Sequence, residues 1–228
     1  MTTPEAFGEA VREGRDDDVA RMLDADPGLA SEPVDGLPPV LLAIFHRRER
    51  TAALLGERAG ALGLPEAAAL GWVEALRAAE ERLRTPGGGT KEALSRPGPN
   101  GWTPLHLAAF FGRPEATAWL LEQGADALAR SRNNEANTPL HAALAGANDP
   151  VVIGLLLEAG ADPNAGAAQG VTPLHMAASR GNGAVVDLLL ARGARAAAME
   201  DGRLPSALAD ERGHPDLVAR LATLEAEG

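Results

Sequence analysis

Apolar residues recur along most of the chain with the period of an α-helix. Leu105, Ala108 and Ala109 fall on one face of a predicted helix, and a pair of leucines at 120–121 marks the apolar face of a second one. Glycines follow the predicted helices, and prolines open several of them, as at positions 112, 114, 124, 150 and 160. This pattern predicts pairs of short helices joined by tight turns.

The tetrapeptide Thr-Pro-Leu-His occurs three times, at 103–106, 138–141 and 172–175. Its histidines, His106, His141 and His175, are separated by 35 and 34 residues, a period typical of stacked helical repeats. We expect each threonine hydroxyl to cap a helix, and the proline suits the first helical position, where no amide hydrogen is needed. Each copy therefore predicts the start of one helix pair.

Three regularly spaced histidines suggest either a structural role or a shared metal or catalytic site. Packed helices lie about 8–10 Å apart, whereas each ligand of a zinc ion lies about 2 Å from the metal. Equivalent histidines on successive units therefore cannot meet. We expect each imidazole to hydrogen-bond backbone groups of adjoining turns, and we predict no catalytic site, no metal and no cofactor.

Residues 98–195 resemble the ankyrin-repeat family in the Thr-Pro-Leu-His start and in the Leu-Leu-x-x-Gly-Ala second half of each unit, as at 120–125. The resemblance implies an all-α fold, an ankyrin-type helical repeat solenoid with short hairpin-like loops and about six helix pairs. We expect one solenoid over 1–228. Its expected segments are an N-terminal capping helix pair (1–30), divergent repeats (35–62 and 64–97, the second with a long Gly/Pro loop), repeats (98–129, 133–164 and 167–197) and a C-terminal capping repeat (200–228).

Two units depart from the pattern. Leu-Pro-Ser-Ala at 204–207 replaces the tetrapeptide, so the threonine cap and the histidine are lost. Ala136 stands where the neighbouring units have Gly101 and Gly170, and the segment 145–154 is one residue longer than its equivalents.

Composition narrows the class of partner. The 228 residues are 45% hydrophobic but only 3% aromatic, which suits close-packed short helices. The formal charge of −11 opposes nucleic acid as a partner, and the absence of cysteine suits a reducing compartment. The N-terminus lacks the basic start and apolar stretch of a signal peptide, and no 18 consecutive residues are apolar. We expect a cytoplasmic monomer that binds neither nucleic acid nor a membrane.

The resemblance also implies the function, a non-enzymatic scaffold for protein–protein interaction that binds another protein. Members of the family contact partners through the hairpin tips and the exposed ends of the first helices, which form a concave surface. The corresponding residues here are Asn100, Trp102, Phe110, Phe111, Asn137, Val171, Ser179, Arg180, Arg203 and Arg212.

Trp102, Phe110 and Phe111 are the strongest candidates for this surface. Three of the seven aromatic residues fall within ten positions, and clustered exposed rings dominate binding hot spots. The alternative is that Phe110 and Phe111 pack under the segment 84–100.

Two further segments suggest other roles. The segment 84–100 carries four glycines and three prolines and lacks the Gly-Lys-Ser/Thr order of a phosphate-binding loop. As a lid over Trp102 and Phe110, it suggests an alternative function as a small-molecule or regulatory-ligand sensor. The basic run His-Arg-Arg-Glu-Arg at 46–50 is either a solvated turn or a contact for an acidic loop of a partner.

Overall fold

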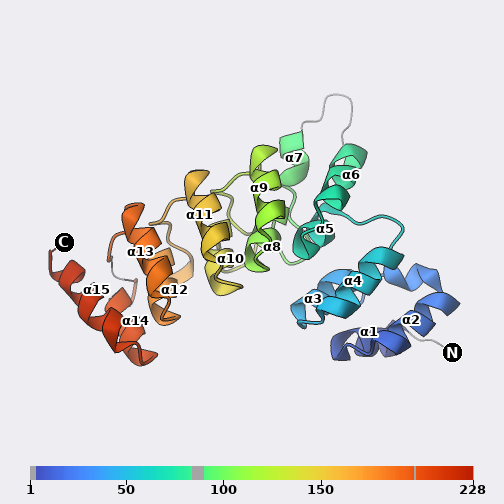
Figure 1. The fold of residues 1–228 in the computed structure, drawn as a ribbon, viewed down its shortest axis with the longest axis horizontal. Helices are drawn as coiled ribbons and strands as arrows, with labels where there is room; N and C mark the ends of the chain where they lie inside the picture. The colour runs from blue at the N-terminus through green and yellow to red at the C-terminus, as the bar shows by residue number, and fades with distance from the viewer. Residues whose placement is uncertain (1–3, 84–89, 198, 228) are drawn as a thin grey trace.

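The structure, a computed structural model, describes residues 4–83, 90–197 and 199–227. Within these ranges, fifteen α-helices and two 3-10 helices follow one another, and the only β pairing is an isolated bridge between Val34 and Leu37. Fourteen of the α-helices form seven consecutive pairs that stack into an arc (Figure 1), against the expected count of about six. No helix among the described residues is long and apolar enough to cross a membrane.

The first helix of each pair lies on the concave side of the arc, and the second lies on the convex side (Figure 1). The inner helices are α1 (Pro4–Glu13), α3 (Pro39–Phe45), α5 (Leu64–Leu70), α8 (Pro104–Phe110), α10 (Pro139–Ala145), α12 (Pro173–Ser179) and α14 (Pro205–Glu211). The outer helices are α2 (Asp16–Ala25), α4 (Glu49–Arg58), α6 (Val73–Leu83), α9 (Pro114–Glu122), α11 (Pro150–Glu158), α13 (Gly183–Ala191) and α15 (Pro215–Glu227). The short helix α7 (Thr90–Leu94) packs on α6, and η1 (Pro27–Ala30) and η2 (Ala168–Gly170) lie in connections.

Proline and alanine explain the close stacking of the inner helices. Proline is the first residue of α3, α8, α10, α12 and α14, as the sequence predicts. Alanine pairs such as Ala108–Ala109 and Ala177–Ala178 are almost fully buried between neighbouring inner helices. Because these side chains are small, the helix axes can approach closely.

The three Thr-Pro-Leu-His copies form the same hydrogen-bonded unit. In each copy the threonine Oγ1 lies 2.8 Å from Nδ1 of its own histidine. The histidine Nε2 contacts a backbone carbonyl of the next unit, and the three contacts are His106 to Asn137 (2.9 Å), His141 to Val171 (3.1 Å) and His175 to Arg203 (3.3 Å). Because a carbonyl only accepts, Nε2 carries the proton and donates it, and Nδ1 accepts from the hydroxyl. The expected structural role of the histidines is confirmed.

The expected threonine caps form in two of the three copies. Thr138 and Thr172 each form a capping box with the histidine three residues later, and Thr138 accepts from the His141 amide at 3.4 Å. Thr103 makes no side-chain bond to an amide of α8. Each hydroxyl also donates to Nδ1 of its own histidine, which orients the ring that joins its unit to the next.

Hairpin-like loops join successive units by one backbone bond each. The Arg132 amide donates to the Gly101 carbonyl at 2.8 Å. Similar bonds run from the Ala168 amide to the Glu135 carbonyl (2.9 Å) and from the Glu200 amide to the Gln169 carbonyl (3.0 Å). Ala136 has a left-handed φ of 48°, where Gly101 and Gly170 have 80° and 74°. The register of the repeat thus imposes a glycine conformation on an alanine.

The last unit replaces the lost threonine and histidine with a carboxylate. The amide and hydroxyl of Ser206, in the first turn of α14, donate to the two carboxylate oxygens of Glu225 on α15, at 2.9 and 2.5 Å. A carboxylate at a helix start satisfies an amide that has no partner within the helix.

Candidate functional site

A shortened turn in the third helix pair brings its two neighbours together. Only Gly71 and Trp72 join α5 to α6, whereas three residues join α3 to α4 and α8 to α9. Rings from the pairs on either side meet across this position. The Phe45 centroid lies 5.3 Å from that of Phe111 and 6.4 Å from that of Phe110.

Four aromatic side chains and His106 form one continuous cluster. Phe110 and Phe111 meet edge to face at 4.9 Å, and Trp102 meets Phe110 edge to face at 5.0 Å. Trp102 also stacks on His106 at 6.1 Å. Such offset and edge-on geometries are the favourable ones for aromatic pairs.

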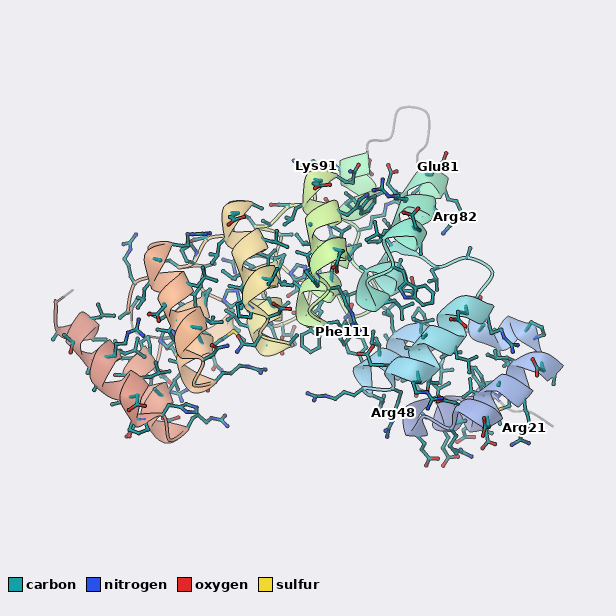
Figure 2. All side chains as sticks on the ribbon, viewed as in Figure 1. Arg21, Arg48, Glu81, Arg82, Lys91 and Phe111 are labelled. Carbon is teal, nitrogen blue, oxygen red and sulfur yellow. The ribbon has the colours of Figure 1, made fainter. Side chains whose placement is uncertain are left out.

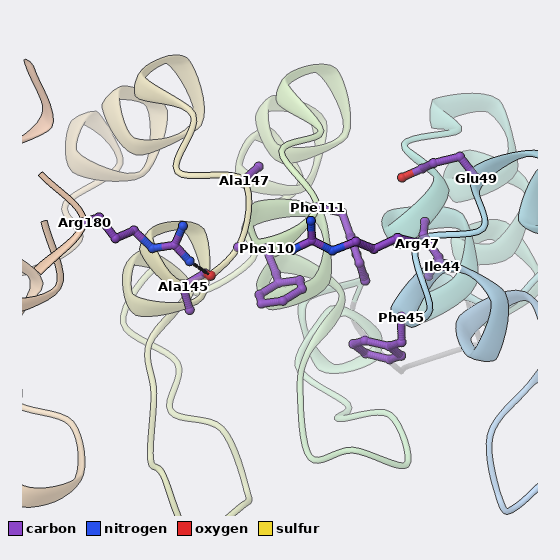
Figure 3. Close-up of a pocket in the computed structure, with 10 residues that line it drawn as sticks. Ile44, Phe45, Arg47, Glu49, Phe110, Phe111, Ala145, Ala147 and Arg180 are labelled. Carbon is purple, nitrogen blue, oxygen red and sulfur yellow. Dashed lines mark hydrogen bonds between the residues drawn. The ribbon is translucent and has the colours of Figure 1, made fainter. Parts of the chain in front are cut away.

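The three phenylalanines of this cluster form one wall of a pocket of about 560 Å3, which we call the aromatic pocket. Figure 3 shows rings from α3 and α8 facing the turn that follows α10. The lining residues are Ile44, Phe45, Arg47, Glu49, Phe110, Phe111, Ala145, Gly146, Ala147 and Arg180.

The opposite wall comes from the lengthened turn between α10 and α11. Four residues, 146–149, make this connection, in agreement with the extra residue expected there. Ala147 donates its amide to the Phe110 carbonyl at 2.9 Å, and a β-carbon at Gly146 would clash with the same carbonyl. The turn therefore leans back onto α8 and closes one side of the pocket.

Two arginines flank the aromatic rings from opposite sides (Figure 3). Arg47, which has a left-handed φ of 58°, extends from the α3–α4 turn toward the rings, and Arg180 donates to the Ala145 carbonyl. The carboxylate of Glu49 is held by Arg113 at 2.8 Å.

A second, smaller pocket of about 320 Å3 continues along the inner helices. It shares Ala145 and Arg180 with the aromatic pocket, and its remaining lining residues are Val171, His175, Met176, Ser179 and Leu208. We call the residues that line the two pockets the inner strip. The strip runs from α3 to α14 along the concave side.

The structure places half of the predicted site residues on the inner strip. These five are Phe110, Phe111, Val171, Ser179 and Arg180. Arg212 is exposed at the end of α14, and it lines neither pocket.

The other four predicted residues have structural partners within their own units. Trp102 was expected to be exposed, but only 8% of it is, because Phe110 and His106 pack against it. The Asn100 side chain accepts from the Trp102 amide, the Asn137 side chain donates to Glu135, and Arg203 pairs with Asp201 at 2.7 Å.

The inner strip also contains three residues that were not predicted for the binding surface, Phe45, Met176 and Leu208. Phe45 had a signal, because it follows Pro39 by six residues, as Phe110 follows Pro104. No sequence pattern marks Met176 or Leu208, since the exposure of these side chains depends on the spacing between neighbouring helices.

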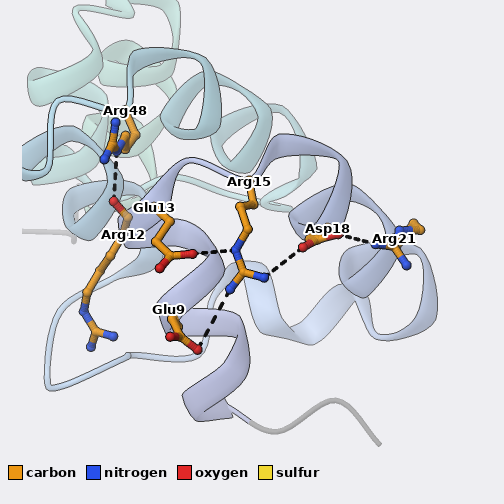
Figure 4. A network of polar contacts seen from close by, with 7 residues as sticks. All are labelled: Glu9, Arg12, Glu13, Arg15, Asp18, Arg21 and Arg48. Carbon is orange, nitrogen blue, oxygen red and sulfur yellow. Dashed lines mark hydrogen bonds and ion pairs between the residues drawn. The ribbon is translucent and has the colours of Figure 1, made fainter.

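The basic run at 46–50 divides between two surfaces. Arg48 donates to the Arg12 carbonyl at 2.9 Å (Figure 4), and Arg50 pairs with Asp16 at 3.6 Å. Both contacts fasten the second pair to the first, where Arg15 also joins Glu13 and Asp18 (Figure 4). Two residues of this run, Arg47 and Glu49, line the aromatic pocket.

The described part of the segment 84–100 does not cover the aromatic pocket. None of the residues lining that pocket comes from 90–100, and α7 packs on the outer helix α6. In Figure 2, Lys91 and Phe111 lie at opposite edges of the molecule. Residues 84–89, the rest of the expected lid, lie outside the described residues.

The histidines have the electrostatics of a packed core. Burial is the main cause that lowers the pKa of His106 to about 4, and burial also lowers the pKa of His141 and of His175. All three are therefore neutral at pH 7. Across the described ranges, no three histidine, aspartate or glutamate side chains are grouped so that they could hold a metal ion.

Comparison with known proteins agrees with this architecture. The family model "Ankyrin repeats (3 copies)" matches residues 67–167 and 147–227. Ankyrin repeat and SOCS box protein 16 of Mus musculus is 43% identical over 99 residues, 40% of this chain and 21% of that protein. Neurogenic locus notch homolog protein 4 of Homo sapiens is 37% identical over 149 residues, 59% of this chain and 7% of that protein.

The alignments thus span about a fifth of these relatives' length or less, and they cover repeats rather than whole proteins. Rabankyrin-5 of Mus musculus shows the same relation, with 32% identity over 52% of this chain and 10% of that protein. The helix pairs, the repeated bonded unit and the family match over more than half of the residues lead to one conclusion. The chain belongs to the ankyrin-repeat family.

Proposed function

We propose that this chain binds another protein along the inner strip and catalyses no reaction of its own. The observation that carries the proposal is the continuity of the two pockets, which share Ala145 and Arg180 and extend over the ends of successive inner helices. Concave, partly apolar surfaces with half-buried aromatic rings are the places where a few residues contribute most of the binding energy.

The family relation supports a binding role. Ankyrin repeats generally serve as protein-interaction modules, and none of the relatives named above carries the name of an enzyme. The cytoplasmic location and the monomeric state stay predictions from the sequence.

Affinity capture from an extract of the source cells tests the proposal. Phe111→Glu places a charge among the pocket rings, and Val151→Glu makes the same kind of change at an outer position that is 60% exposed. We expect proteins held by the wild type and by Val151→Glu to be lost with Phe111→Glu, while thermal unfolding shows that both variants are folded. Retention by Phe111→Glu together with loss by Val151→Glu would place binding on the outer helices and refute the proposal.

A further inference from the structure

Two arginines that have no carboxylate partner in the described part of the chain, Arg47 and Arg180, line the aromatic pocket. Within the described residues, no carboxylate lies within ion-pair distance of Arg47 or Arg180, whereas Arg12, Arg58 and Arg220 each pair with an aspartate. Arg180 is held by a neutral carbonyl. Glu49 is the one carboxylate among the described residues that line the pocket, and it is already paired with Arg113.

The chain as a whole has a formal charge of −11. Two arginines without carboxylate partners at one pocket therefore give this site a local positive charge on an acidic protein. An extended polyanion such as nucleic acid would meet repulsion beyond the pocket, whereas a short acidic segment would meet only the two guanidinium groups.

The space between the arginines is apolar on its inner side. Phe45, Phe110 and Phe111 face a pocket whose volume of about 560 Å3 lies within the roughly 300–1,000 Å3 of sites that enclose a ligand. One bulky apolar side chain fits against the rings, and groups on either side of it in the sequence would lie near Arg47 and Arg180.

From this arrangement we infer that the aromatic pocket takes a short segment of a partner protein in which a bulky apolar residue has carboxylates before and after it. The apolar residue packs on the three phenylalanine rings, and the carboxylates pair with the two guanidinium groups, which suit planar, bidentate contacts with carboxylates. The inference rests on the proposed function and specifies the chemistry of the partner at that site.

Selection from a displayed library of random peptides tests the inference on the full chain. We expect enrichment of peptides with leucine, phenylalanine or tryptophan between aspartates or glutamates. One enriched peptide is then labelled, and its affinity is measured for the wild type, Arg47→Glu, Arg180→Gln and the control Arg195→Glu, an exposed arginine that lines neither pocket.

Arg47→Glu should weaken binding about tenfold, because it replaces an attraction at a partly exposed site with a repulsion. Arg180→Gln should weaken it less, and Arg195→Glu should leave it unchanged. Changing the acidic residue on one side of the peptide to lysine should restore binding to Arg47→Glu, a rescue that loss of folding cannot mimic.

Two other outcomes separate the inference from the proposed function. Enriched peptides that lack acidic residues, or that bind Arg47→Glu as well as the wild type while failing to bind Phe111→Glu, overturn the inference and leave the function intact. Peptides that bind Phe111→Glu, Arg47→Glu and Arg180→Gln like the wild type overturn both.

Discussion

At the scale of single residues, the repeat imposes its geometry on every copy, including the copies whose sequence has drifted. Ala136 shows this most directly, because its φ of 48° belongs to the left-handed region in which a β-carbon is strained. The neighbouring units place glycine at the same point of the hairpin-like loop, so the strain comes from the residue and not from the loop.

Ala136→Gly should therefore stabilise the protein. The left-handed conformation costs an alanine about 1–2 kcal/mol. Glycine removes this cost, but its greater freedom in the unfolded chain offsets part of the stabilisation. Denaturant unfolding should show an increase of up to about 1 kcal/mol in the free energy of unfolding. Ala78→Gly on the exposed face of α6 is the matched control and should lower stability by about 1 kcal/mol. Equal destabilisation by both changes would contradict the assignment of strain at Ala136.

At the scale of elements, departures from the repeat build the site. The α5–α6 turn is one residue shorter than its neighbours, which lets Phe45 meet Phe111, and the α10–α11 turn is one residue longer, which lets it lean on α8. A perfectly periodic chain would have evenly spaced turns and no such pocket.

Gly146→Ala tests the contact between the longer turn and α8. The added methyl group would clash with the Phe110 carbonyl, so the turn must move away, at a cost of about 1–3 kcal/mol in stability. Gly154→Ala is the matched control, because its methyl group would meet nothing within 4 Å. This change replaces a glycine inside α11 with alanine, which should raise the free energy of unfolding by about 1 kcal/mol. Thermal or denaturant unfolding of the two variants measures both signs, and a neutral Gly146→Ala would show that the turn is not fixed against α8.

The sequence predicts much of the fold, because short local patterns determine where each helix begins and ends. Proline at a helix start and glycine after a helix act within one turn of chain. The first helices of the three units with the Thr-Pro-Leu-His tetrapeptide therefore begin at the predicted residues, Pro104, Pro139 and Pro173. The site is less predictable, because exposure depends on neighbouring units. Trp102 is covered by Phe110 and His106, and no local pattern reports that cover.

At the scale of the whole molecule, the three buried histidines link successive units. Each Nε2–H donates to a carbonyl of the following unit, which leaves Nδ1 as the nitrogen that can take up a proton. Protonation of Nδ1 would place a charge in the buried core and remove the acceptor of the threonine hydroxyl. Stability of a stack is approximately the sum of its units and the interfaces between them. The histidines therefore make these interfaces sensitive to acid.

The free energy of unfolding should fall as pH decreases from about 6.5 toward about 4. Over this range the unfolded chain binds protons at histidines whose ordinary pKa is about 6.5, whereas folded His106, with a pKa of about 4, does not. His106 alone contributes a slope of about 1 kcal/mol per pH unit. Urea unfolding between pH 6.5 and pH 5, where most carboxylates remain ionised, should show this slope, and His106→Gln should reduce it. A stability that is flat over this interval would contradict neutral, buried histidines.

The proposed binding role depends on where a partner contacts the chain. The most direct measurement is the structure of this chain bound to a protein or peptide that it captures. We predict that the ligand lies along the concave side, in contact with Phe111 and Arg180 and with the residues around them on the inner strip. A complex in which the ligand contacts only the outer helices, and leaves both pockets uncovered, would contradict it.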